Sequence, residues 1–193
     1  MIRMTMKRKK IFIKRSFPSR LLGALTLDPR LYKEVETDPA AFKQAAVVVF
    51  FSSLAGGLGA PASGAGLAGF AWGAAAAFCG WMIWTSSIYF VGVKWLAGPM
   101  TYSNPGGLLR GAAFASAPGL IRVLGIHPFL RNYVLLIAFV WMLVAMVITV
   151  RQSLDYTTGV QAFLICLAGS VFQLGLAFGL LWFKGPGDLL IPV

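Results

Sequence analysis

The sequence predicts an all-α fold: a polytopic bundle of transmembrane helices preceded by a short amphipathic N-terminal helix. Hydrophobic residues make up 58% of the 193 residues and charged residues only 12%, whereas a soluble domain has roughly 25% charged residues. The apolar residues are grouped in stretches about as long as a hydrocarbon core of ~30 Å requires. Lipid offers the backbone no hydrogen-bond partners, and a helix pairs its backbone polar groups within a single segment.

The first 36 residues form a basic segment that we expect on the cytosolic side of the membrane. Most of the seventeen Lys and Arg residues lie at or before Lys43. A basic cluster beside the first apolar span is retained in the cytosol, and it attracts anionic headgroups. An arm that binds nucleic acid is the alternative, but the cluster lacks the interleaved aromatic residues of a stacking surface. The residues predicted to bind anionic lipid are Lys7, Arg8, Lys9, Lys10, Lys14 and Arg15.

Two Asp-Pro pairs mark helix starts, one within this basic segment and one at the start of the bundle, which we place at residues 37–193. In Asp28-Pro29 and Asp38-Pro39 the aspartate can act as the N-cap and the proline as the first helical residue. Leucines at near-helical spacing before Asp28 make the lead-in amphipathic. The second pair begins the first membrane helix.

Five apolar segments follow the lead-in. We expect spans at about residues 43–60, 66–95, 107–126, 129–150 and 160–183. Trp81 and Trp84 lie in the second half of the second segment, where aromatic residues favour the headgroup interface. The third segment holds Pro118 between Arg110 and Arg122, and we predict a helix broken at Pro118 whose arginines extend outward to the interface.

The third segment has a competing interpretation as a re-entrant or interfacial hairpin, which leaves four crossings. Five crossings place Arg122, Arg131 and Lys184 on the outer side, whereas four place only Arg151 there. The positive-inside rule therefore slightly favours four.

Catalytic and metal-binding patterns are missing from the sequence. All six acids lie in predicted loops or termini, and His127 is the single histidine, whereas a zinc site needs three or four ligands. Residues 64–69 match GxGxxG, but that motif has meaning only between a strand and a helix. Cys79 and Cys166 lie within apolar stretches and predict no disulfide framework. We therefore expect no enzyme, no cofactor and no metal.

Small residues at helical spacing form two strips that predict close helix packing. The strips consist of Gly69, Gly73 and Ala77 in the second span and Gly175 and Gly179 in the fifth. Packing within the bundle and packing against another membrane protein or a second copy both remain open.

Three segments between Arg20 and Phe183 carry a family resemblance. They are residues 25–32 (LTLDPRLY), 109–119 (LRGAAFASAPG) and 141–146 (WMLVAM), the last leading into residues 150–156 (VRQSLDY). In this order, after a basic N-terminus, they resemble the Yip (Ypt-interacting protein) membrane family in its bacterial form. The resemblance implies five helices with a cytosolic N-terminus, and we therefore expect five spans. Eukaryotic relatives bind Rab-type GTPases, but this chain lacks their long acidic, Pro-rich region.

These observations predict a non-enzymatic integral membrane scaffold or accessory subunit in a bacterial inner membrane. It would pack with a partner membrane protein or with copies of itself, and hold anionic lipid. The alternative is a small-solute or lipid transporter whose third span lines a pathway for an anionic substrate, as discontinuous helices do. The residues of that possible pathway are Arg110, Pro118 and Arg122.

Overall fold

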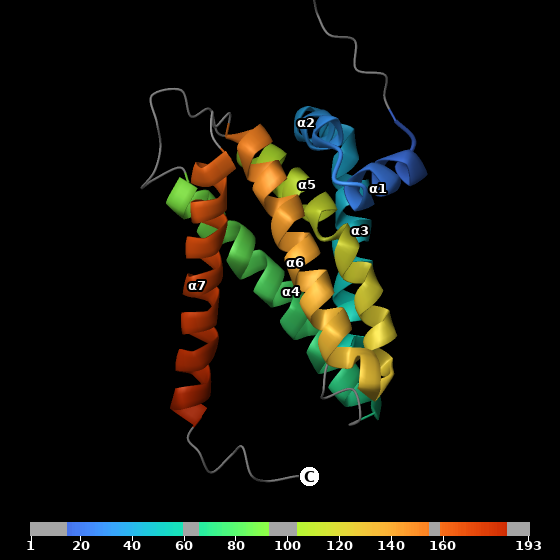
Figure 1. Ribbon diagram of the computed structural model, residues 1–193, viewed down its shortest axis with the longest axis vertical. Coiled ribbons are helices and arrows are strands. Elements are labelled where there is room, and N and C mark those ends of the chain that lie inside the picture. Colours follow the sequence, from blue (N-terminus) through green and yellow to red (C-terminus); the bar gives the residue numbers. More distant parts are fainter. Residues whose placement is uncertain (1–14, 60–65, 93–103, 155–158, 185–193) are drawn as a thin grey trace, which may run out of the picture.

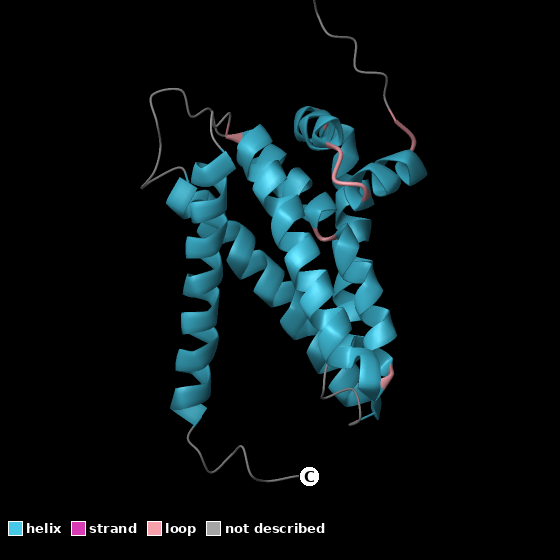
Figure 2. Cartoon of the chain, viewed as in Figure 1, coloured by secondary structure: helices cyan, strands magenta, loops and turns pink. Residues whose placement is uncertain are grey.

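The computed structural model describes residues 15–59, 66–92, 104–154 and 159–184, with side chains described as far as Gln173 and Gly175. Every element in these ranges is helical (Figure 2), which confirms the all-α prediction. The elements are α1 (Phe17–Leu25), α2 (Pro29–Thr37), η1 (Pro39–Ala41), α3 (Phe42–Gly59), α4 (Gly66–Phe90), α5 (Pro105–Ala115), η4 (Ala117–Ile126), α6 (Pro128–Ser153) and α7 (Gly159–Lys184).

The lead-in consists of two helices, α1 and α2, where the sequence predicted one short amphipathic helix. They meet at a turn in which Leu27 has a positive φ of 59°. Asp28 caps α2 by accepting a hydrogen bond from the backbone N–H of Arg30 at 3.0 Å. Asp38 likewise accepts one from the N–H of Ala40 at 3.1 Å. Both predicted Asp-Pro helix starts are therefore confirmed. We call α1 and α2 the N-terminal hairpin.

Four described segments are long and apolar enough to cross a membrane: Pro39–Gly59, Gly66–Phe90, Pro105–Ile126 and Pro128–Ser153. They correspond to the first four predicted spans. In the second, α4 ends at Phe90, and residues 93–95 of the predicted span lie outside the described residues. α7 has 26 residues and corresponds to the fifth prediction, although its fully described apolar part, Gly159–Gln173, is shorter than the other four.

The break in the third span lies at Ser116, two residues before the predicted position. α5 ends at Ala115, and the chain continues as the 3₁₀ helix η4 from Ala117. The predicted cause holds, because Pro118 lacks an N–H and its ring crowds the preceding turn, so the α-helix must stop before it. The backbone N–H of Ser116 bonds instead to the carbonyl of Ala113 at 3.2 Å.

The third segment runs the full length of the bundle rather than forming a hairpin at one end. At its start, a Cβ on Gly107 would lie 2.8 Å from the side chain of Glu36 in α2. At its finish, a Cβ on Gly125 would lie 3.2 Å from the Cα of Gly59, the last residue of α3. α5 and η4 together therefore extend from the N-terminal hairpin to the far end of α3.

Figure 1 shows the N-terminal hairpin over one end of the bundle, α4 crossing obliquely, and α7 at the edge. α3 packs on α4 and η4, α6 packs on α5 and η4, and α7 packs on α4 and α6. The crossing of α3 and α4 is close, because a Cβ on Gly57 would lie 2.7 Å from both the amide nitrogen of Ala74 and the carbonyl oxygen of Phe70. Only a residue without a side chain fits there.

Candidate functional site

Arg20 of α1 is the centre of a buried polar network at the hairpin end. Its side chain is 1% exposed. Its Nε and Nη2 donate to Oε1 of Glu34 at 3.0 and 2.8 Å, and Nη2 also donates to Oδ2 of Asp38 at 2.7 Å. Nη1 donates to Oε1 of Gln44 in α3 at 2.8 Å. Arg20 therefore joins α1, α2 and the start of the first span.

The ionisation of the network follows from these contacts. Burial alone would lower the pKa of Arg20, but its hydrogen bonds to Asp38 and Glu34 outweigh burial and raise the pKa above its ordinary value. Burial would raise the pKa of Asp28, but a hydrogen bond from Nη1 of Arg15 at 2.8 Å helps to lower it. Arg15 also lies 3.4 Å from Oε2 of Glu34. Arg20 and Asp28 are therefore both stabilised in their ionised forms.

Two further cations fasten the N-terminal hairpin to the bundle. Arg110 of α5 donates from Nε to the carbonyl of Val35 at 2.8 Å and from Nη2 to the carbonyl of Glu36. These carbonyls lie in the last turn of α2, where a positive charge also interacts favourably with the helix dipole. Lys33 donates to the carbonyl of Gln152 in α6 at 2.9 Å. The hairpin is thus held on α5 and α6 as well as on α3.

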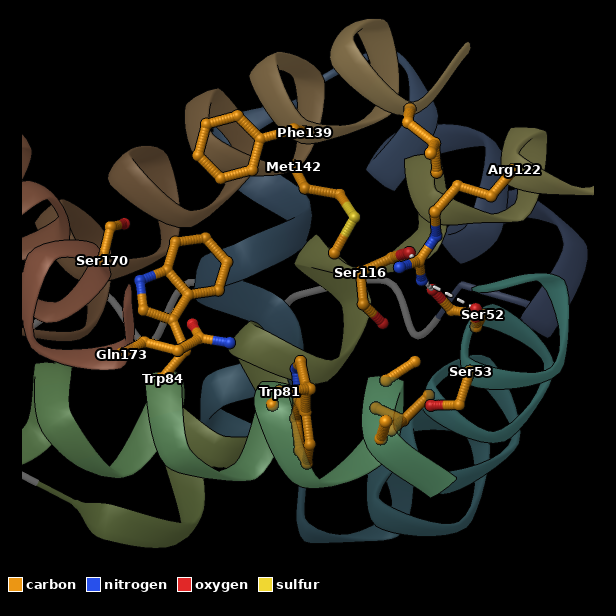
Figure 3. A pocket seen from close by; sticks show the side chains of 15 residues that line it. Ser52, Ser53, Trp81, Trp84, Ser116, Arg122, Phe139, Met142, Ser170 and Gln173 are labelled. Atoms are coloured by element: carbon orange, nitrogen blue, oxygen red, sulfur yellow. Dashed lines mark hydrogen bonds between the residues drawn. The ribbon is translucent and has the colours of Figure 1, made fainter. Parts of the chain in front are cut away.

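A cavity of about 390 Å³ lies inside the bundle, at the break of the third span. Side chains from α3, α4, η4, α6 and α7 line it, together with Ser116 at the break (Figure 3). Its apolar wall includes Val49, Trp81, Trp84, Phe139 and Met142. Phe139 is 51% exposed, so the cavity reaches the outer surface of the bundle beside α6.

Arg122 of η4 is the cation of this cavity. Its Nη2 donates to the carbonyl oxygen of Ser52 at 2.7 Å and to the Oγ of Ser52 at 2.9 Å. Ser52 in turn donates its hydroxyl to the carbonyl of Ser116 at 2.8 Å. The Nε of Arg122 donates to the carbonyl of Gly119 at 3.0 Å. In Figure 3 the guanidinium group points toward Ser52 and Ser116.

Trp84 packs inside the bundle against α7, and its place at the headgroup interface stays a prediction. Its side chain is 6% exposed, and its indole N–H donates to the carbonyl of Cys166 in α7 at 3.4 Å. Trp81 donates to the carbonyl of Ala112 in α5 at 3.3 Å. A buried indole needs an acceptor for its N–H, and neighbouring helices supply one in each case.

The structure separates the three residues of the predicted pathway. Pro118 and Arg122 belong to η4, where Pro118 is buried at the break and Arg122 faces the cavity. Arg110 instead binds the end of α2 and does not line the cavity. The side chain of Arg110 is buried against α2 and that of Arg122 turns inward to Ser52, so neither arginine extends outward from the bundle as predicted. Their depth relative to the headgroup interface stays a prediction.

The small-residue strips lie in different surroundings. In α4, Gly69 is buried, Gly73 is half-buried, and Ala77 faces Gly56 of α3, on which a Cβ would lie 2.9 Å from that of Ala77. In α7, Gly175 is exposed and a Cβ there would meet nothing within 4 Å. Gly179 lies outside the residues whose side chains the structure describes.

Of the six predicted lipid-binding cations, Arg15 lies in the network around Glu34, and the others lie outside the described residues: Lys7, Arg8, Lys9, Lys10 and Lys14. Sequence reasoning missed Arg20, although an arginine within an amphipathic helix followed by Glu34 and Asp38 suggests an ion pair. It also missed Ser52, one of two serines in an otherwise apolar stretch.

No protein-family model, curated protein or solved structure matches this chain.

Proposed function

We propose that this chain is a non-enzymatic scaffold or accessory subunit of a bacterial inner membrane, with five spans and a cytosolic N-terminus. One observation carries the proposal: the N-terminal hairpin is fastened to three helices of the bundle, α3 through Arg20, α5 through Arg110 and α6 through Lys33. A surface held in this way is preorganised for binding, so a partner need not order it.

The topology is part of this proposal and is supported by the alternation of the helices. α3 and η4 finish at the same end of the bundle, since Gly59 and Gly125 lie close together, and the N-terminal hairpin lies at the other. α6 returns to the hairpin, where Gln152 accepts a hydrogen bond from Lys33. α7 then crosses again as the fifth span. Membership of the Yip family rests on the quoted sequence segments and likewise remains a proposal.

The exposed position of Gly175 in α7 supports a contact with another transmembrane helix. Gly175 leaves room for a neighbouring backbone, whereas Ala77 of the α4 strip already faces Gly56 of α3. Close packing of small residues is a principal means of helix association in lipid. The neighbour is a helix of a partner membrane protein or of a second copy.

The scaffold role is tested by purifying the full chain in mild detergent and measuring the mass of the complex by light scattering. We expect a species heavier than one chain, with Gly175→Leu reducing it and Gly159→Leu leaving it unchanged. Gly159 is a matched control, because a Cβ there also meets nothing within 4 Å but the residue lies at the start of α7. A lone monomer without a copurifying protein would count against the proposal.

The lipid part of the proposal concerns Lys7, Arg8, Lys9 and Lys10. Replacing all four with Gln should make the N-terminal tail more accessible to protease in vesicles that contain anionic lipid, and should change nothing in neutral vesicles. Equal protection of the two proteins in anionic vesicles would refute lipid binding by these residues. A C-terminal reporter tests the topology, because five spans place it in the periplasm and four in the cytosol.

Transport remains the second candidate function, favoured by the cavity at the broken third span. An alternating-access protein binds its substrate near the midplane between discontinuous helices, and the break at Ser116 adjoins such a cavity. Flux of anionic solutes into liposomes, compared between the unaltered chain and Arg122→Gln, tests this alternative.

A further inference from the structure

Arg122 is a half-buried cation that lines the cavity of an apolar bundle, and its contacts leave its charge uncompensated within the described part of the chain. The three oxygens that it contacts belong to Ser52 and Gly119 and are neutral. A charged side chain at membrane depth is costly and is normally paired. The hydrogen bonds fix the position of the guanidinium group but supply no negative charge.

The acids of the described ranges are placed where they cannot supply that charge. They are Asp28, Glu34, Glu36 and Asp38, and all of them lie in or beside the N-terminal hairpin. Glu34 and Asp38 are bonded to Arg20, and Asp28 to Arg15. Arg122 lies toward the opposite end, where its backbone carbonyl adjoins Gly59.

We propose that the cavity binds an amphipathic anion, a single-chain lipid whose carboxylate or phosphate group binds Arg122 and whose tail lies along the apolar wall. This inference goes beyond the scaffold role, which needs no ligand in the cavity.

The guanidinium group has a free donor for such an anion. Nε and Nη2 make the hydrogen bonds to Gly119 and Ser52, whereas Nη1 has no acceptor among the described residues. Nη1 lies near Gly56, on which a Cβ would be 3.1 Å away. Any side chain at position 56 would crowd this donor. Because a guanidinium group binds carboxylate and phosphate oxygens strongly, Nη1 is suited to hold one oxygen of the ligand.

The other residues that line the cavity suit the hydrocarbon tail of such a lipid. Val49, Leu135, Phe139 and Met142 are apolar, and Trp81 and Trp84 present their rings from α4 (Figure 3). Ala76 and Phe139 line the cavity and are also exposed, so a chain can leave between α4 and α6 into the surrounding lipid. A volume of about 390 Å³ lies toward the lower end of small-molecule pockets, which favours one tail over two.

The test uses the delipidated full chain in detergent and a dibrominated fatty acid, because bromine quenches indole fluorescence at short range. Trp81 and Trp84 line the cavity and serve as reporters. We expect saturable quenching, an affinity at least tenfold weaker in Arg122→Gln, and no change in Arg131→Gln. Arg131 is a matched control, because its Nε binds the carbonyl of Gly125 at the same end of the bundle and the residue does not line the cavity.

A second variant keeps the test decisive if Arg122→Gln does not fold. Ala76→Phe fills the exit between α4 and α6 and leaves every hydrogen bond of Arg122 in place, and it should also weaken quenching at least tenfold. Unchanged affinity in Ala76→Phe, or in a folded Arg122→Gln, would overturn the proposal. The double variant Trp81→Phe/Trp84→Phe removes both reporters, so saturable quenching should be lost. Quenching as strong as in the unaltered chain would place the bromine elsewhere and overturn the proposal.

Competition identifies the ligand class and its source. Unlabelled fatty acid should displace the probe if the natural anion is a carboxylate, and a lysophosphatidic acid should displace it better if the anion is a lipid phosphate. A monoacylglycerol of the same chain length and inorganic phosphate should both fail. Displacement by the neutral lipid at equal concentration would refute the role of charge, and displacement by inorganic phosphate alone would refute the role of the tail. Since each measurement uses the isolated chain, failure here leaves the scaffold test untouched.

Discussion

The guanidinium group of Arg20 and the carboxylate of Glu34 form an ion pair 2.8 Å long that is almost completely buried, with side chains 1% and 5% exposed. It joins the two helices of the N-terminal hairpin. Because both partners are removed from water, the loss of either deprives the other of a buried opposite charge that its remaining contacts, Arg15 with Glu34 and Asp38 with Arg20, only partly replace.

Replacing Arg20 with Gln should therefore destabilise the fold strongly. Removing one member of a buried ion pair costs about 3–5 kcal/mol, and Glu34 and Asp38 would both lose this cation. Arg30→Gln is the matched control: Arg30 is exposed on the same hairpin, and such a change is usually within about 0.5 kcal/mol. Denaturant titrations of the two variants in the same detergent provide the comparison. Equal unfolding midpoints would show that the buried pair contributes nothing.

Asp28 should give the hairpin an acid-sensitive contact. The structure holds the pKa of Asp28 below its ordinary value of 3.8, so the contact stabilises the fold fully above that value and is lost as pH falls through the lowered pKa. Asp28→Asn keeps a residue that caps α2 well but removes the titration. We expect the melting temperature of the unaltered chain to fall more between pH 5 and pH 3 than that of the variant. Parallel acid profiles would contradict this assignment.

Gly57 and Gly175 should respond in opposite ways to the same substitution. A Cβ at residue 57 would overlap the backbone of α4, and overpacking of this kind costs about 1–3 kcal/mol or more. At residue 175 a Cβ meets nothing, and alanine improves helix propensity by up to ~1 kcal/mol. Thermal unfolding of Gly57→Ala and Gly175→Ala as monomers in detergent tests both expectations. If Gly57→Ala is neutral, the α3–α4 crossing is not as close as described.

Arg110 should control the dynamics of α2. Arg110→Gln removes hydrogen bonds to the carbonyls of Val35 and Glu36, and each bond to a charged group contributes roughly 1.5–3 kcal/mol. Hydrogen exchange of the α2 amides should therefore become at least tenfold faster, with little change in α6. Arg151→Gln, at an exposed position in the last turn of α6, is the control. Unchanged exchange in α2 would mean that Lys33 and Arg20 hold the hairpin without Arg110.

The sequence predicted the helices well because their signals are local. An Asp-Pro pair contains both the cap and the first residue of the helix that it begins, as Asp28 and Asp38 show. A long run of apolar residues likewise indicates by itself that the segment is a membrane span. The break at Ser116 was predicted two residues late, because a proline limits the helix ahead of itself.

The hydrogen-bond partners of the long side chains were less predictable from the sequence. Arg110 and Arg122 look alike in sequence, each at one end of the same apolar segment, yet Arg110 binds α2 and Arg122 reaches Ser52. Which carbonyl groups lie within reach depends on the packing of other helices, and that packing is set by close contacts such as Gly57 against Phe70 and Ala74. The burial of Trp84 was not predicted for the same reason, since its acceptor lies in α7.

The 3₁₀ form of η4 has a consequence for register. With three residues per turn, side chains at i and i+3 eclipse one another, so Gly119, Arg122 and Gly125 stack along one edge of η4. That edge faces α3: a Cβ on Gly119 would lie 2.5 Å from the Oγ of Ser52, and one on Gly125 would lie 3.2 Å from the Cα of Gly59. In an α-helix each step of three residues falls about 60° short of a full turn, so the same three residues would not lie along one edge. The tighter winding thus places Arg122 between two glycines on the edge that faces α3 and directs its side chain toward Ser52.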